Sequence, residues 1–92
     1  MQFEWDDEKN KINIKKHKLN FSVAKFVFND ENRIEIFDDI HSDNEDRYIT
    51  IGAIDQVPIV VTVVYTERGQ RIRIISARKA TAEERRMYYD NL

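Results

Sequence analysis

Two segments near opposite ends of the chain carry side chains that suit chemistry on a phosphodiester. Residues 9–17 include Lys16 and His17 beside further lysines, and residues 73–78 form a predicted strand that ends in Arg78. An imidazole transfers protons near neutral pH, and a guanidinium binds a phosphate with two hydrogen bonds while keeping its charge. Together these groups predict a protein that holds or cleaves RNA.

Metal-free RNA cleavage needs a base for the 2′-hydroxyl, cations for the charge of the transition state and an acid for the leaving oxygen. The residues predicted for these tasks are Lys16, His17, Arg47 and Arg78. Arg78 is well placed because it ends a strand just before a helix whose first amides attract anions. The structural alternatives are a helical His17 bonded to a carbonyl group, and a surface ion pair of Arg47 with Glu45 or Asp46.

A helix over residues 9–17 would gather further groups around the histidine. At 100° per residue, Lys9 and Asn13 fall in the same arc of about 100° as Lys16 and His17. Lys9 and Asn13 are therefore predicted to contact RNA.

Three residues in the second half of the chain are also predicted to contact RNA. Arg85 and Tyr89 are one helical turn apart and offer a cation and a stacking ring, while Tyr65, near the end of a strand, is a further stacking residue or proton donor. Tyrosines at such positions more often belong to a core. His41 lies in an acidic loop and is not expected to take part in catalysis.

The composition argues against metal, disulfide and membrane functions. The chain of 92 residues has no cysteine and two histidines far apart in sequence, so we expect neither a metal nor another cofactor. The acidic start lacks an apolar signal segment, and no run approaches the roughly 20 apolar residues of a membrane span. A cytoplasmic protein without membrane contact is expected.

The net charge of −2 conceals three blocks of opposite sign. Residues 9–25 contain six lysines and no acidic residue, residues 30–46 contain eight acidic residues and one arginine, and residues 68–86 contain seven basic residues and two glutamates. Two basic surfaces that converge would suit RNA. The alternative is that each block is a solvated face that attracts the others.

The pattern of apolar residues predicts one α+β domain over residues 1–92. After an extended start and an acidic cap at residues 6–8, it predicts two N-terminal helices, over residues 9–17 and 22–28. A four-stranded antiparallel meander follows, and a capping box at residues 81–84 starts a C-terminal helix that runs to about residue 89. The strands are predicted at residues 33–37, 47–51, 58–66 and 71–74, with residues 55–56 as a two-residue link and the third strand central.

Several short motifs are specific in combination. Residues 3–17 read Phe-x-Trp-Asp-x-x-Lys-x-x-x-Asn-x-x-Lys-His, and residues 73–85 contain Arg-Ile-Ile-Ser-Ala-Arg-x-Ala followed by Glu-Arg. Other matching positions are Phe21, Ala24, Val27, Phe28, Glu45, Arg47, Gly52, Val64, Tyr65, Thr66, Arg68 and Tyr88. With these motifs the chain resembles the BrnT toxin family over nearly its whole length. Members often have glycine where this chain has Lys18, so a helix-ending residue is replaced here.

The resemblance implies a RelE-like ribonuclease fold and an RNA-cleaving toxin of a type II toxin–antitoxin pair. It also implies a BrnA-like antitoxin that silences the toxin and represses their shared promoter, so that operator DNA is contacted only through the antitoxin. It supports Lys16, His17, Arg47 and Arg78 as site positions without deciding which group is the acid and which the base.

Two other functions fit the same residues. A binding module without turnover would use the basic cleft to hold RNA or an acidic partner, and an inactive relative would use it only to receive an antitoxin. RNA fragments that end in a cyclic phosphate would favour the enzyme, whereas salt-sensitive binding without fragments would favour the module.

Overall fold

The structure is a computed structural model that describes residues 1–55 and 57–92. In chain order its elements are β1 (Gln2–Glu4), α1 (Asp7–His17), α2 (Phe21–Ala24), the 3-10 helix η1 (Lys25–Asn29), β2 (Ile34–Phe37), β3 (Arg47–Ile54), β4 (Ile59–Arg68), β5 (Arg71–Lys79) and α3 (Ala82–Asp90). Gln56, half of the predicted two-residue link, lies outside the described residues.

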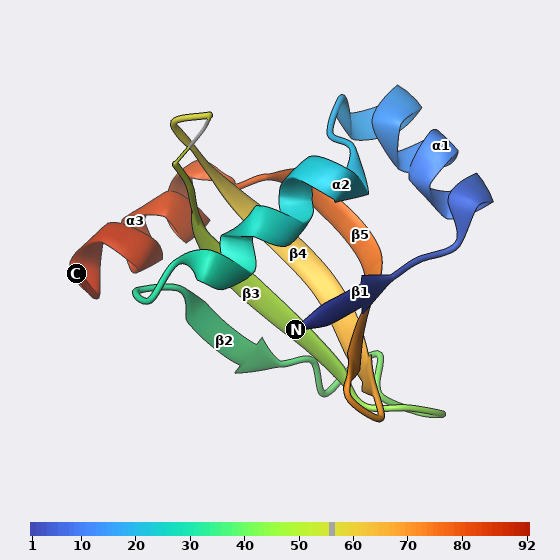
Figure 1. The fold of residues 1–92 in the computed structure, drawn as a ribbon. Coiled ribbons are helices and arrows are strands. Elements are labelled where there is room, and N and C mark those ends of the chain that lie inside the picture. Colours follow the sequence, from blue (N-terminus) through green and yellow to red (C-terminus); the bar gives the residue numbers. More distant parts are fainter. Residues whose placement is uncertain (56) are drawn as a thin grey trace.

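The strands form one twisted sheet in the order β1-β5-β4-β3-β2 (Figure 1). The pairs β2–β3, β3–β4 and β4–β5 are antiparallel, whereas β1 pairs in parallel with β5. Strand β4 is central, as its continuous apolar sequence predicted. Gly69, with φ of +61°, supplies the left-handed residue in the tight turn between β4 and β5.

The predicted fold class, two N-terminal helices followed by a four-stranded antiparallel meander, is wrong. The described residues contain a five-stranded mixed sheet and three α-helices, and the chain begins with a strand. Phe3 of β1 pairs with Ile72 of β5, a partner almost seventy residues away. A three-residue strand is too short to show a period in sequence, and its pairing depends on a long-range contact. The second predicted helix is a single α-helical turn that continues as η1.

Local hydrogen bonds explain where two of the helices begin. The carboxylate of Asp6 accepts from the backbone N–H groups of Glu8 and Lys9 at the start of α1. At α3, Thr81 and Glu84 bond each other's backbone N–H groups, which confirms the predicted capping box.

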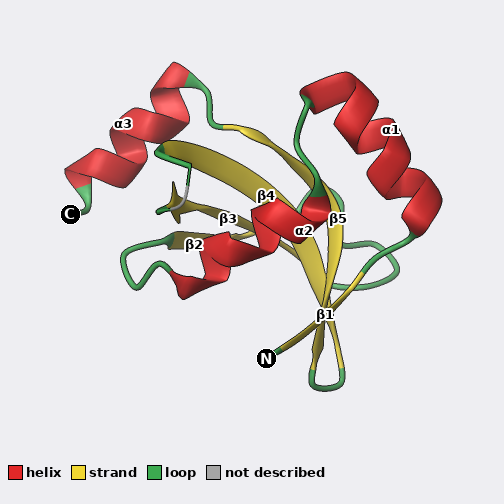
Figure 2. Cartoon of the chain, turned by 45° about the horizontal axis from the view of Figure 1, so that its top comes forward, coloured by secondary structure: helices red, strands yellow, loops and turns green. Residues whose placement is uncertain are grey.

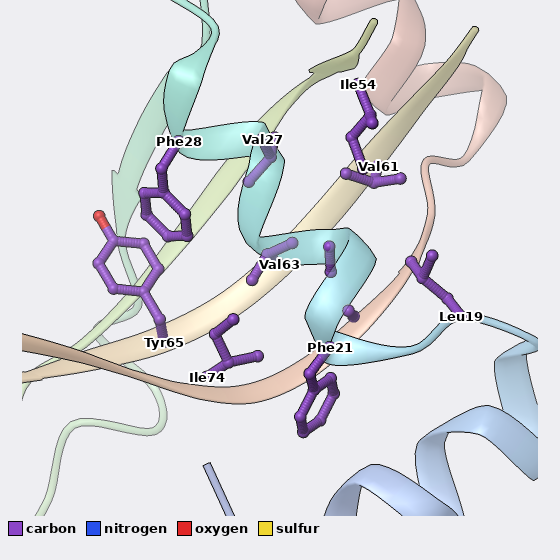
Figure 3. Close-up of a cluster of buried hydrophobic side chains, with 11 residues drawn as sticks. Leu19, Phe21, Val27, Phe28, Ile54, Val61, Val63, Tyr65 and Ile74 are labelled. Carbon is purple, nitrogen blue, oxygen red and sulfur yellow. The ribbon is translucent and has the colours of Figure 1, made fainter. Parts of the chain in front are cut away.

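The main core lies between α2–η1 and one face of the sheet. Figure 3 shows Val27 and Phe28 of η1 packed over Val61, Val63 and Ile74 of the strands. Figure 1 shows α2 and η1 crossing in front of this face.

The opposite face of the sheet is covered in part by α3. Tyr88 packs with Ile51, Val60 and Ala80 in a second, smaller cluster. Helix α1 instead contacts β5, so α1 and α3 occupy separate places on the sheet (Figure 2). None of the helices in the described ranges is long and apolar enough to cross a membrane.

Candidate active site

A pocket between α1 and β5 brings together four of the residues predicted for the site. We call it the α1 pocket, and it is lined by Lys9, Ile12, Asn13, Lys16, His17, Ile75 and Ser76. His17 is half-buried, while the two lysines are exposed. The side of α1 that was predicted to carry Lys9, Lys16 and His17 therefore faces β5. An imidazole beside two ammonium groups suits an anionic ligand.

Asn13 docks α1 onto the edge of β5. Its Nδ2 donates to the carbonyl oxygens of Leu19 (2.9 Å) and Ala77 (2.8 Å), and its Oδ1 accepts from the backbone N–H of Ala77 (3.1 Å). Of the residues of α1, all of which the structure describes, Asn13 alone is buried. Both amide donors are used, so Asn13, predicted to contact RNA, instead holds the α1 pocket together.

The face of the sheet opposite α2 carries several arginines, among them Arg47, Arg73 and Arg78. The register pairs Arg47 with Thr66, Thr66 with Arg73, and Thr62 with Arg78. Paired residues on adjacent strands project to the same side of a sheet. We call this surface the arginine face, defined by Arg47, Arg73, Ser76 and Arg78.

A β-bulge in β5 places these arginines on one face. The register shifts at Ile75, which has no partner of its own on β4. Under strict alternation Arg73 and Arg78, five positions apart, would project to opposite sides. Ser76, which follows the bulge, belongs to the arginine face and also lines the α1 pocket. The two surfaces therefore meet at Ser76.

Arg78 is held by a carboxylate of α3. Its Nη1 donates to Oε1 of Glu84 (2.6 Å) and its Nη2 donates to Oε2 (3.0 Å). This contact, with further hydrogen bonds from Thr81 and Thr62, lowers the pKa of Glu84 to about 2. The phosphate clamp predicted at Arg78 is thus already paired with an anion.

Arg47 has different surroundings at the other end of the arginine face. Its Nε is buried and has no hydrogen-bond partner among the residues that the structure describes. Glu45, proposed from sequence as an ion-pair partner, contacts Arg68 instead (Nη2 to Oε2, 3.4 Å). The pocket beside Arg47 is lined mainly by the acidic loop: Ile40, His41, Asp43, Asn44 and Glu45.

The predicted catalytic residues do not all share one pocket. Neither arginine is among the described residues that line the α1 pocket. Arg47 and Arg78 are separated by about 13 Å along the strands and about 10 Å across them. Ser76 lies in the row between these two arginines. The residues predicted for catalysis therefore lie along an extended surface with the α1 pocket at one edge.

Comparison with protein families identifies the family to which this chain belongs. A family model described as the ribonuclease toxin BrnT of type II toxin–antitoxin systems matches residues 5–84, which include the α1 pocket, the arginine face and Glu84. The chain belongs to the BrnT family. A BrnT protein is a ribonuclease toxin, and its type II system implies a protein antitoxin as partner. A search of curated proteins gave no significant match.

Lys18 occupies the position at which the BrnT resemblance led us to expect glycine. It ends α1 in the left-handed conformation, with φ of 59°, and its backbone N–H donates to the carbonyl oxygen of Ile14 (2.8 Å). The helix ends as a glycine-capped helix would, although a lysine is strained in this conformation.

Tyr65 lies on the α2 face, away from the arginine face of this BrnT protein. Its ring stacks on Tyr48 with a centroid distance of 5.6 Å. It also meets Phe28 edge-on, with a centroid distance of 4.9 Å (Figure 3). Its hydroxyl donates to Glu35, and burial together with this bond raises its pKa. The residue is 1% exposed, so no ring face is open for a nucleobase.

Arg85 and Tyr89, predicted as an RNA-contacting pair, line one pocket near the end of the sheet. Lys79 and Pro58 line the same pocket. The ring of Tyr89 is largely exposed, and Nη1 of Arg85 donates to the carbonyl oxygen of Ala80 (2.9 Å). The pair therefore meets, but at a place separate from the α1 pocket.

Three residues of these surfaces are not among the predicted site residues: Arg73, Ser76 and Glu84. Arg73 pairs with Glu4 of β1 (2.7 Å), a contact that depends on the unpredicted strand. Glu84 was recognised only as a helix cap, because nothing in its spacing indicates a bond to Arg78. Ser76 had a signal, since it lies within the Ile-Ser-Ala-Arg motif.

Proposed function

We propose that this protein is a metal-independent endoribonuclease that cleaves RNA, and so inhibits translation and growth, until a BrnA-like antitoxin covers it. Membership of the BrnT family supports the ribonuclease activity and the antitoxin. The observation that carries the proposal is the junction at Ser76, where the pocket with Lys16 and His17 adjoins the arginine face.

The reaction follows from the groups at this junction. The 2′-oxygen attacks the adjacent phosphorus, the bond to the 5′-oxygen breaks, and the products end in a 2′,3′-cyclic phosphate and a 5′-hydroxyl. His17 relays a proton in this exchange. Lys16 and Arg78 stabilise the charge on the phosphate in the transition state, which is usually the largest contribution to such catalysis.

The separation of the two arginines suggests a path for the RNA. A strand that has its scissile phosphate at Lys16 and Arg78 extends along the arginine face, where Arg47 binds a neighbouring phosphate. Lys9 contributes a further cation in the α1 pocket. Arg85 and Tyr89 bind a flanking nucleotide by charge and stacking. Operator DNA is contacted only by the antitoxin.

Incubation of the EDTA-treated protein with RNA tests this function. We expect fragments with cyclic phosphate ends without added metal, and a loss of cleavage in Lys16→Ala. Lys15→Ala is the matched control, because Lys15 is an exposed lysine of α1 that does not line the pocket. Fragments only with added Mg²⁺ would remove metal independence, and salt-sensitive binding without fragments would establish the non-catalytic module.

The pH dependence of cleavage tests the role of His17. If His17 relays the proton, His17→Ala flattens one limb of the pH–rate profile. An unchanged profile in His17→Ala would exclude this residue from proton transfer.

A further inference from the structure

Among the described residues, the hydrogen bonds of Arg78 use one edge of its guanidinium and leave the other edge without a partner. Nη1 is bonded to Oε1 of Glu84 and, at 3.3 Å, to the carbonyl oxygen of Lys79, while Nη2 is bonded to Oε2 of Glu84. A guanidinium has five N–H donors. The N–H of Nε and the second N–H of Nη2 form the other bidentate edge of the group, which matches the spacing of two phosphate oxygens.

Glu84 cannot easily leave this contact. Its Oε1 accepts a hydrogen bond from Oγ1 of the buried Thr62 (3.0 Å) and another from the backbone N–H of Thr81 (2.8 Å). Its side chain is 19% exposed, against 37% for Arg78. A carboxylate fixed by a strand and by the first turn of α3 sets the direction of the guanidinium that it binds.

We infer that Glu84 is a positioning residue for RNA cleavage, which holds one edge of Arg78 so that the Nε–Nη2 edge meets the phosphate. This rests on the proposed function, because it takes Arg78 as the group that binds the scissile phosphate. The arrangement has a cost, since the carboxylate places a negative charge near the RNA and weakens binding. Glu84 therefore favours the rate of cleavage over the affinity for RNA.

Glu84→Gln separates these two effects. Glutamine keeps the capping box and a hydrogen bond from Thr62, but its amide N–H₂ faces the Nη2 donor of Arg78 and cannot accept from it. We expect the dissociation constant for RNA to fall about threefold, because a like charge is lost. We expect kcat to fall about tenfold or more, because Arg78 is no longer oriented.

Two further variants complete the experiment. Glu83→Gln makes the same change in net charge at an exposed neighbour on α3, and should change neither quantity. Thr62→Val removes one hydrogen bond to Glu84 without changing charge, so kcat should fall while affinity stays the same. Circular dichroism verifies that each variant is folded. If Glu84→Gln is unfolded, the kcat and RNA affinity of Thr62→Val test the inference in its place.

The outcomes separate this inference from the proposed function. Cleavage and binding in Glu84→Gln equal to those of Glu83→Gln would overturn the positioning role while leaving the ribonuclease intact. A parallel loss of kcat and affinity would also overturn it, since that is the result of general damage. If the unmodified protein does not cleave RNA, the proposed function fails and the positioning role fails with it, an outcome distinct from an active protein in which Glu84→Gln and Glu83→Gln behave alike.

Discussion

Arg78 and Arg47 lie on the same face of one sheet, yet their surroundings are opposite in kind. Arg78 is bound by a fixed carboxylate through two hydrogen bonds, whereas Arg47 has a buried Nε without a partner among the described residues. A buried donor without a partner is costly, and a shift of the Arg47 side chain that brings this donor to an anion gains a bond that the described residues do not supply. Because Glu84 already binds Arg78, this arginine contributes less to the affinity for RNA, but its guanidinium is already oriented.

This difference assigns the two arginines different tasks in the proposed reaction. A guanidinium that is oriented before the reaction stabilises the charge of the transition state more than it stabilises bound RNA. Arg78 should therefore act mainly on kcat. A donor that gains its bond on RNA binding favours bound RNA and transition state alike, so Arg47 should act mainly on affinity.

The largest expected effect is that of Arg78→Ala on the rate of cleavage. We expect kcat to fall about 100-fold or more, with a smaller change in the affinity for RNA. Single-turnover cleavage and equilibrium binding measure the two quantities. Because Arg78→Ala leaves the charge of Glu84 without its partner, the double variant Arg78→Ala/Glu84→Gln serves as the control for folding. Cleavage at the original rate would remove Arg78 from catalysis.

The contact between Arg78 and Glu84 should also make stability depend on acid. The folded state lowers the pKa of Glu84 from 4.5 to about 2, so the unfolded chain takes up this proton first as the pH falls. The contribution to stability is present above pH 4.5 and is lost between about pH 4.5 and 2, and it is on the order of 2 kcal/mol.

Urea unfolding at pH 7, 4 and 3 measures this dependence. The fall in stability with acid should be smaller in Glu84→Gln than in Glu83→Gln. Equal pH dependence in the two variants would show that the ion pair contributes little.

Arg47→Ala should weaken RNA binding about tenfold with little change in kcat, the reverse of Arg78→Ala. The loss of one phosphate contact should reduce the slope of log affinity against log salt by about 0.7 for single-stranded RNA. A titration of RNA binding against salt concentration measures this slope. Equal effects of the two arginine variants on kcat and affinity would contradict the division of tasks.

The smallest expected effect is that of Lys18→Gly, which touches neither arginine. Because Lys18 has φ of 59°, glycine should relieve strain and stabilise the fold by about 1 kcal/mol. Thermal unfolding measures the gain. RNA cleavage at temperatures where both proteins are folded should stay unchanged, because Lys18 is not among the described residues that line the α1 pocket.

Much of the site could be predicted because it depends on local spacing. Lys9, Lys16 and His17 share a pocket since helical periodicity alone puts them on one side of α1. The capping box at Thr81 and Glu84 is equally local. Asn13 shows where this reasoning stops: its position on the helix was right, but its amide bonds the edge of β5, which the helix alone could not reveal.

The sequence by itself determined the family motifs, the charge blocks and the caps of α1 and α3, because these depend on neighbours within a few positions. The continuous apolar run of β4 also indicated a strand covered on both faces, which is typical of a central strand. Only the tertiary structure decided the pairing of β1 with β5, the shift at Ile75 that puts Arg73 and Arg78 on one face, and the bond between Arg78 and Glu84. These features are set by strand register and packing, which join residues distant in sequence and leave no periodic signal in either segment.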